Sequence, residues 1–192
     1  MKFLFCEGKN DKAVIQSLLK HLGMDARVEW TGGKDNLSNF LEEVSKRPEF
    51  AQQQVTAFGI FRDANGDAAA AFTSVSDALQ QNKFSPPNAD RTFSNGSPRV
   101  GICIVGVDGR GMIEDVCLKS VSDQPEFACV EEYFACIAIR SSRSDFSAKA
   151  KVRVWMASHV DHEYYVGKAA EEGYWPWDHS AFDIVKSFLK AL

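Results

Sequence analysis

The chain has 192 residues and a net charge of −4, with 45% hydrophobic and 25% charged residues. This length and composition are typical of one globular domain, and the acidic balance excludes binding of nucleic acid by bulk electrostatics. The number of cysteines, five, is odd and none form a CxxC pair, so the sequence indicates neither a disulfide framework nor a zinc ribbon and predicts reduced thiols in a cytoplasmic protein. No apolar run is long enough to span a bilayer, so we expect no membrane partner.

Apolar runs and helical patterns alternate over the first half of the chain. We predict strands at 3–6, 26–30, 55–61 and 100–107. We predict helices at 11–22, from Asp35 to near Pro48, and at 67–79, with Asp35 as the cap of the second helix. This alternation predicts an α/β fold, with a parallel sheet of about four strands flanked by helices.

The remaining segments contain one long turn-rich tract and a helical end. Residues 82–99 contain three prolines and no periodicity, which is typical of a functional or mobile loop. From Gly111 onward the pattern is mostly helical, with helices predicted at 129–139, at 149–159 and from Asp178 or His179 to Leu192. We expect a single compact domain, with an α/β core over 1–120 and a helical extension over 121–192 packed on it.

Carboxylates follow three of the predicted strands. Glu7 follows the first, the segment "DANGD" with Asp63, Asn65 and Asp67 follows the third, and Asp108 follows the fourth with Glu114 beyond it. Because the ends of parallel strands share one edge of a sheet, these groups should converge in one crevice. Clustered carboxylates repel unless a cation lies among them, and oxygen ligands favour Mg²⁺, Mn²⁺ or Ca²⁺.

The segment "DANGD" has alternative interpretations. A calcium loop of the EF-hand type needs glycine at its sixth position and glutamate at its twelfth, where this chain has Ala68 and Ser74. Taken alone, the segment fits a turn followed by a helix N-cap. Taken together with Glu7 at another strand end, it favours a metal site.

The order of these segments resembles the Toprim domain, which topoisomerases, bacterial primases and the overcoming-lysogenization-defect (OLD) nucleases share. "FCEGKNDKAVIQSLL" resembles the first motif of that family, "GGKDNLSNFL" its second-strand glycine segment, and "GMIEDVCL" an additional acidic segment of the OLD-type branch. With the tail "GYWPWDHSAFDIVKSFLKAL", the whole chain is similar to a small standalone Toprim-like family. The resemblance implies a Rossmann-like parallel sheet with a helical C-terminal part.

The resemblance also implies hydrolysis of phosphodiesters, or a related phosphotransfer, with Mg²⁺ or Mn²⁺. In that interpretation Glu7 is a general acid/base or a metal ligand and Asp63 is a metal ligand. Asn65, Asp67 and Glu114 would complete the metal shells. Asn65 stands where the family pattern has its second aspartate, which removes one negative charge. The alternative is therefore a catalytically weakened Toprim-like module that binds nucleic acid or a partner protein, an ATPase among the candidates.

Basic and aromatic residues offer further candidates. The residues considered for phosphate contact are Lys9, Arg140, Arg143, Lys149, Lys151 and Arg153. The five that follow residue 139 equally fit a solvated face. The pair His159-x-x-His162 has helical metal spacing but also fits ordinary surface histidines. The segment "YWPW" at 174–177 fits base stacking or, more simply, packing of the last helix.

Overall fold

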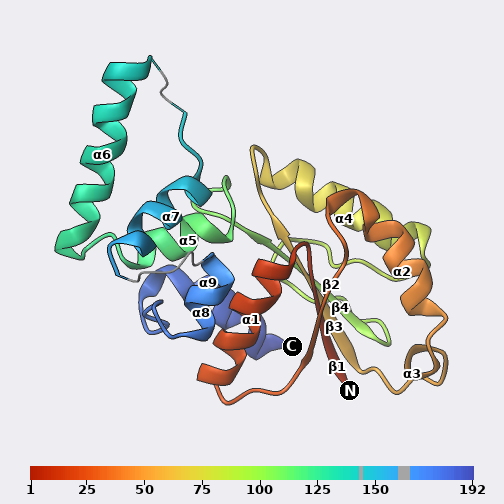
Figure 1. Ribbon diagram of the computed structural model, residues 1–192. Helices are drawn as coiled ribbons and strands as arrows, with labels where there is room; N and C mark the ends of the chain where they lie inside the picture. The colour runs from red at the N-terminus through yellow and green to blue at the C-terminus, as the bar shows by residue number, and fades with distance from the viewer. Residues whose placement is uncertain (143–144, 160–164) are drawn as a thin grey trace.

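The computed structural model describes residues 1–142, 145–159 and 165–192. Within these residues, parallel strands form one sheet in the order β2-β1-β3-β4 (Figure 1). The strands are β1 Lys2–Cys6, β2 Arg27–Trp30, β3 Ala57–Asp63 and β4 Arg99–Val105. The α/β class and the four-stranded parallel sheet that the alternation predicts are confirmed.

Alternate residues of the strands face two separate apolar cores. Phe3, Phe5 and Phe58 face helices α2 Leu37–Ser45, α3 Pro48–Ala51 and α4 Ala68–Gln81. Leu4, Cys6 and Phe61 face helix α1 Lys9–His21 and the C-terminal helices. Figure 1 shows these two helical layers on opposite sides of the sheet. Because both faces are covered, the stretches 3–6, 57–61 and 100–105 are apolar throughout rather than alternating with polar residues, whereas the edge strand β2 carries Arg27 and Glu29.

The second helical segment begins differently from the prediction. A short 3-10 helix, Lys34–Asn36, precedes α2, and Gly33 at its cap position has a φ of 105°. Asp35 therefore lies inside the first turn instead of capping the helix, so that prediction was wrong. The glycine is needed here because a side chain rarely adopts this left-handed conformation.

The turn-rich tract after α4 lies along the outer edge of β4. The backbone N–H of Arg91 donates to the carbonyl of Ile102 (2.7 Å). Conversely, Val100 N–H donates to Ser94 Oγ (3.0 Å), and Ile104 N–H donates to Asp90 Oδ1 (2.8 Å). The Phe93 ring occupies the space that a Cβ would need at Gly101. The tract thus takes the position of a further strand.

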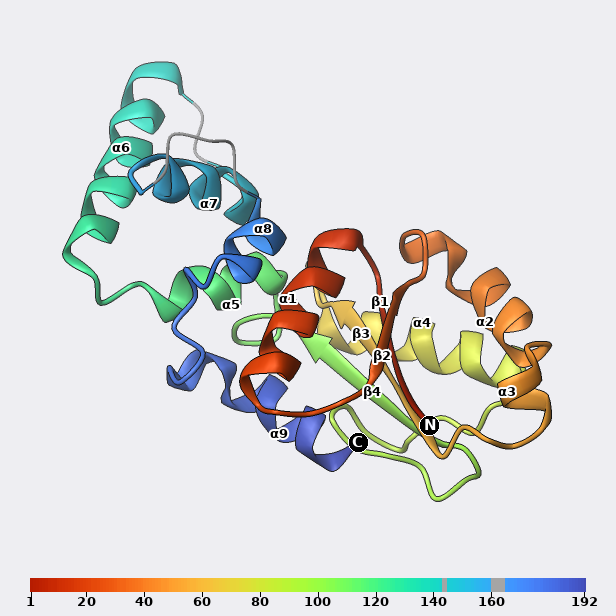
Figure 2. The same ribbon diagram turned by 60° about the horizontal axis from the view of Figure 1, so that its bottom comes forward.

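The C-terminal part is helical, as predicted. Its helices are α5 Ile113–Ser120, α6 Pro125–Ser141, α7 Ala148–Ala157, α8 Val166–Glu171 and α9 Asp183–Ala191, with a 3-10 turn at Ser180–Phe182. One apolar cluster runs from Leu4 in the sheet to Trp155 in α7 and Phe188 in α9. Figures 1 and 2 show α6 at the far end of the molecule, beside α7 and away from the sheet. The division near residue 120 stays a prediction. Among the described helices, none is long and apolar enough to cross a membrane.

Candidate functional site

The candidate site lies where the strand order reverses direction. The chain passes from β1 to β2 on one side and to β3 on the other, so a crevice opens at the carboxyl ends of β1 and β3. Cys6 is paired with Phe61, which places Glu7 beside Arg62 and Asp63. Glu7 and Asp63 line one small pocket of about 10 Å³ at this edge. The structure thus brings these two predicted residues together.

Glu7 contacts an arginine from the neighbouring strand. The Nε of Arg62 lies 3.1 Å from Glu7 Oε2 as an ion pair. Neither atom has an aligned hydrogen bond to any described residue. Burial raises the pKa of Glu7, Arg62 lowers it, and Asp11 raises it further. The contact between Glu7 Oε2 and Arg62 Nε is thus an ion pair without an aligned hydrogen bond.

Asp63 has the most altered acidity of the site. Its Oδ1 accepts a hydrogen bond from the backbone N–H of Ile113, at the start of α5 (3.1 Å). Burial raises the pKa of Asp63 to about 8, and Asp11, Glu114 and Glu7 add to the shift by repulsion. At neutral pH without a cation, Asp63 therefore carries a proton most of the time.

Asp11 is a member of this group that the sequence analysis did not select. It lies in the first turn of α1, and its Oδ2 accepts the backbone N–H of Gly8 at 2.7 Å. Its pKa is raised by burial. In the sequence, an aspartate in the first turn of a helix is explained by helix capping. That explanation gives no reason to expect Asp11 beside Glu7 and Asp63. The available signal was position, because α1 begins directly after Glu7-Gly8 at the same sheet edge.

Glu114 completes the group from α5. It is only 3% exposed, and its Oε2 has no hydrogen-bond partner among the described residues. Burial is the main cause that raises the pKa of Glu114. The side chain also lines a second pocket of about 140 Å³, together with Asn10, Lys149 and Arg153. A buried carboxylate oxygen without a partner is costly, which indicates that a cation or donor belongs here. We call Glu7, Asp11, Asp63 and Glu114 the carboxylate group.

Lys149 supplies positive charge to this group from α7. Its charge lowers the pKa of Glu7, Asp11 and Glu114. Of the basic residues considered in the sequence, Lys149 is thus the one whose charge acts on three of the four carboxyls. Sequence spacing alone did not single it out, because α7 reaches the sheet edge only through tertiary packing.

Asn65 and Asp67 serve the turn that follows β3. The backbone of Asn65 pairs with Gly111 in both directions, through N–H to O distances of 2.7 and 2.6 Å, and its φ is 50°. Asp67 caps α4, where its Oδ1 accepts the backbone N–H groups of Ala69 (2.9 Å) and Ala70 (3.0 Å). Both side chains are exposed. In this arrangement they do not join the carboxylate group, and their role as ligands stays a prediction.

The remaining basic candidates that the structure describes come from helices α1, α6 and α7 and have different partners. Lys9 lies over the Trp30 ring, Lys151 pairs with Glu131 at 2.8 Å, and Arg153 lies over Tyr165. Arg140 donates to Cys136 Sγ (2.6 Å) on α6, and Arg143 lies outside the described residues. Their role as phosphate contacts stays a prediction.

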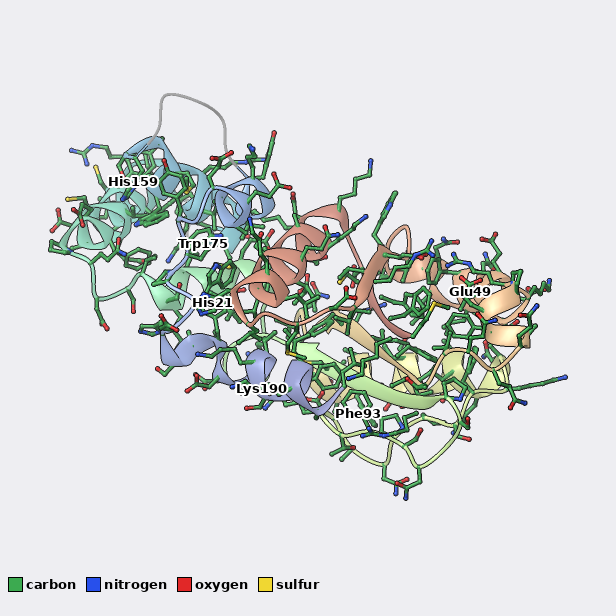
Figure 3. All side chains as sticks on the ribbon, turned by 90° about the horizontal axis from the view of Figure 1, so that it is seen from below. His21, Glu49, Phe93, His159, Trp175 and Lys190 are labelled. Atoms are coloured by element: carbon green, nitrogen blue, oxygen red, sulfur yellow. The ribbon has the colours of Figure 1, made fainter. Side chains whose placement is uncertain are left out.

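His159 and Trp175 lie at the end of the molecule away from the sheet (Figure 3). His159 and Trp175 lie at the same end of the molecule in Figure 3, and both rings contact Trp155, at centroid distances of 4.2 and 5.1 Å. Trp175 donates its Nε1–H to the carbonyl of Val166 and is 2% exposed. This burial supports the packing interpretation of "YWPW". His162 lies outside the described residues.

In the described structure, the side chains of the carboxylate group would have to move before they could bind a metal ion. Among residues 1–142, 145–159 and 165–192, no three His, Cys, Asp or Glu side chains stand as they would around a metal ion. The carboxylate group still fits a hard divalent cation chemically, because its oxygens are of the preferred type and the Glu114 Oε2 lacks a partner among the described residues. A cation between Glu7 and Asp63 would require Glu7 to separate from Arg62.

Comparison with known proteins places the chain in a family. Residues 1–192 match the family described as "Protein of unknown function (DUF3226)", and the chain belongs to it. No curated protein matches the chain. Among solved structures, it is similar to the C-terminal region of the OLD protein of Xanthomonas campestris pv. campestris. The identity is 10% and the TM-score 0.48, over 99% of this chain and 93% of that one. OLD proteins are among those that the sequence motifs resemble.

Proposed function

We propose that this protein is a Toprim-like enzyme that hydrolyses phosphodiester bonds of nucleic acid with Mg²⁺ or Mn²⁺ held by Glu7 and Asp63. The observation that carries the proposal is the carboxylate group itself. Its members come from β1, α1, β3 and α5, meet at one sheet edge, and share pKa values raised by burial. Strongly perturbed carboxyls in a crevice are typical of catalytic sites.

Each side chain has a distinct role in this proposal. The metal, when bound, supplies the positive charge that holds a phosphate and makes water a stronger acid. Glu7, once separated from Arg62, accepts the proton of the attacking water at Oε2. Arg62 and Lys149 then face the phosphate with positive charge, which stabilises the charge that develops in the transition state. Asp63 is held in place by the Ile113 N–H.

A second candidate is favoured by the Arg62 contact. An ion pair between Arg62 and Glu7 at 3.1 Å neutralises the carboxylate that the enzyme needs. If it persists, the protein is a module that binds nucleic acid or a partner protein without cleaving. Asn65 stands where the Toprim pattern has its second aspartate and lacks that negative charge, which favours the same candidate.

One experiment separates the candidates. Single- and double-stranded DNA and RNA are incubated with the purified protein and Mg²⁺ or Mn²⁺ at about 5 mM, a concentration at which weak carboxylate sites bind a divalent cation. The enzyme is supported if a chelator stops the cleavage and the Glu7→Gln variant shows none. The matched control is Asp77→Asn, at an exposed position of α4, which should cleave as the wild type does. Binding of nucleic acid without cleavage supports the module. Full activity of the Glu7→Gln variant would contradict the assigned role.

A further inference from the structure

The second pocket lies at the junction of α1, α5, α7 and the start of α8, helices that Figure 2 shows together at one side of the sheet. Its volume is about 140 Å³, and its polar lining residues are Asn10, Glu114, Lys149, Arg153 and Tyr165. We call it the α7–α8 pocket. Of the residues that the structure describes, Glu114 lines this pocket but not the small pocket at Glu7 and Asp63. Glu114 is therefore open to a ligand other than a cation held by Glu7 and Asp63.

Glu114 gives the α7–α8 pocket a requirement for a hydrogen-bond donor. The residue is 3% exposed, and its Oε2 has no hydrogen-bond partner among the described residues. Burial raises the pKa of Glu114, whereas its own backbone N–H and the charge of Lys149 lower it and so favour the carboxylate form. A carboxylate only accepts hydrogen bonds, so a ligand that fits brings an N–H or O–H group to Oε2.

Basic side chains give the same pocket a requirement for negative charge. Lys149 and Arg153 lie one turn apart on α7, and both line the pocket. The guanidinium of Arg153 lies over the Tyr165 ring, 5.3 Å from its centroid, and Val152 and Val166 supply the apolar part of the wall. The ligand therefore combines a donor group, a flat ring and a neighbouring negative charge. A nucleotide of a single strand has all three.

The size of the α7–α8 pocket and its open acceptor select among the bases. Its volume of about 140 Å³ holds about five waters of about 30 Å³ each, which is the space of one ring and not of a whole nucleotide. Cytosine presents a 4-amino group that a glutamate accepts, whereas thymine and uracil present a 4-carbonyl oxygen that a carboxylate repels. In a duplex the base is stacked and paired, so only an unpaired base reaches the buried Oε2.

We propose that the α7–α8 pocket binds one unpaired cytosine of single-stranded nucleic acid, with the 4-amino group donating to Glu114 Oε2 and the phosphate beside Lys149 and Arg153. The inference rests on the proposed function, because it takes nucleic acid as the ligand, and it adds which part of the strand is recognised. The charge of Glu114 acts on Asp63, so the pocket adjoins the carboxylate group. The bound base therefore belongs to a nucleotide next to the phosphate that the enzyme cleaves.

Binding without metal tests the pocket apart from catalysis. Fluorescence anisotropy in the presence of chelator compares labelled strands of about eight nucleotides, all deoxycytidine or all thymidine, a length within the range that one small domain covers. The wild type should bind the cytosine strand about tenfold more tightly, the difference that one hydrogen bond to a buried charged group makes. Glu114→Gln, whose amide can donate to a 4-carbonyl as well as accept, should reduce this preference to within about twofold.

Charge variants separate recognition of the base from contact with phosphate. Arg153→Gln should weaken binding of both strands equally and reduce the slope of log affinity against log salt by about one. Lys190→Gln, at an exposed position of α9 labelled in Figure 3, removes the same charge away from the pocket and should change neither strand. Equal binding of both strands by the wild type, or a preference that survives Glu114→Gln, would overturn the inference and leave the proposed function standing. Binding of neither strand would overturn both.

Discussion

The carboxylate group and the turn at 65–67 are neighbours in the sequence but have opposite environments. Asp63 ends a buried strand, and its pKa is raised to about 8 by burial and by other carboxyls. Asp67, four residues later, is exposed and its oxygen accepts two backbone N–H groups at the start of α4. The difference shows that the direction of a strand, and not the density of acidic residues, decides which carboxylates meet.

The largest effect should come from removing a carboxylate of the group. Asp63→Asn should weaken Mn²⁺ binding by about 100-fold or more, since even outer-shell changes at metal sites cost 10- to 100-fold. The same change should stabilise the metal-free protein at pH 9, where the wild-type carboxylate is ionised and repelled by its neighbours. Calorimetric titration with Mn²⁺ and thermal melts with chelator measure both. Unchanged Mn²⁺ affinity would remove Asp63 from the metal site.

The second effect is a dependence of stability on pH. The folded pKa of Asp63 is about 8, well above that of an unfolded aspartate, and Glu7, Asp11 and Glu114 shift in the same direction. The stabilising contribution of their protonated forms is complete below about pH 4 and is lost as pH rises through about 8. Urea unfolding of the metal-free protein should therefore show stability falling over this window. Saturating Mn²⁺ should suppress the fall, because it replaces the protons.

A smaller effect is expected at the cap of α4. Asp67→Ala removes the acceptor of two backbone N–H groups and should cost about 1 kcal/mol, or about 2–4 °C in Tm. Asp67→Asn should cost much less, because asparagine also caps helices. The Mn²⁺-induced rise in Tm should equal that of the wild type in both variants. A reduced rise with Asp67→Asn would place Asp67 in the metal shell after all.

The smallest effect is expected at Asn65. Its backbone pairs with Gly111 at a φ of 50°, a conformation that aspartate also tolerates. Asn65→Asp should change stability by less than about 0.5 kcal/mol, as most exposed substitutions do. Thermal melts with chelator and with excess Mg²⁺ should give the same shift as the wild type. A larger shift in the variant would mean that residue 65 reaches the metal and that the turn at 65–67 is part of the same site as Asp63.

Much of the fold follows from local signals in the sequence. Apolar runs that end in polar residues locate the strands, and their alternation with helices fixes the parallel sheet. The meeting of Glu7 and Asp63 follows from that rule alone, because each comes at the end of its strand. The sequence therefore predicts that Glu7 and Asp63 lie together, as they do in the structure, and their roles stay predictions.

The rest of the site depends on packing that the sequence does not display locally. Asp11 fits a helix cap, and only the placement of α1 directs it to the crevice. Lys149 reaches the group because α7 packs on α5 and α8, 142 positions after Glu7 along the chain. The positive φ of Asn65, in the turn that leads to Asp67 at the start of α4, accompanies its backbone pairing with Gly111. Each of these depends on contacts between distant segments.

The tract that lies along β4 has a consequence for solubility. An uncovered edge strand offers unpaired backbone groups to any other chain, which is how sheets join and aggregate. Here Ser94 and Asp90 accept the outward N–H groups of Val100 and Ile104, and Phe93 covers Gly101. The prolines of this tract, which cannot donate to a ladder, keep it from becoming a strand that would itself recruit neighbours. Proteins cut within residues 85–98 should therefore associate edge to edge through β4 while their sheet is still folded.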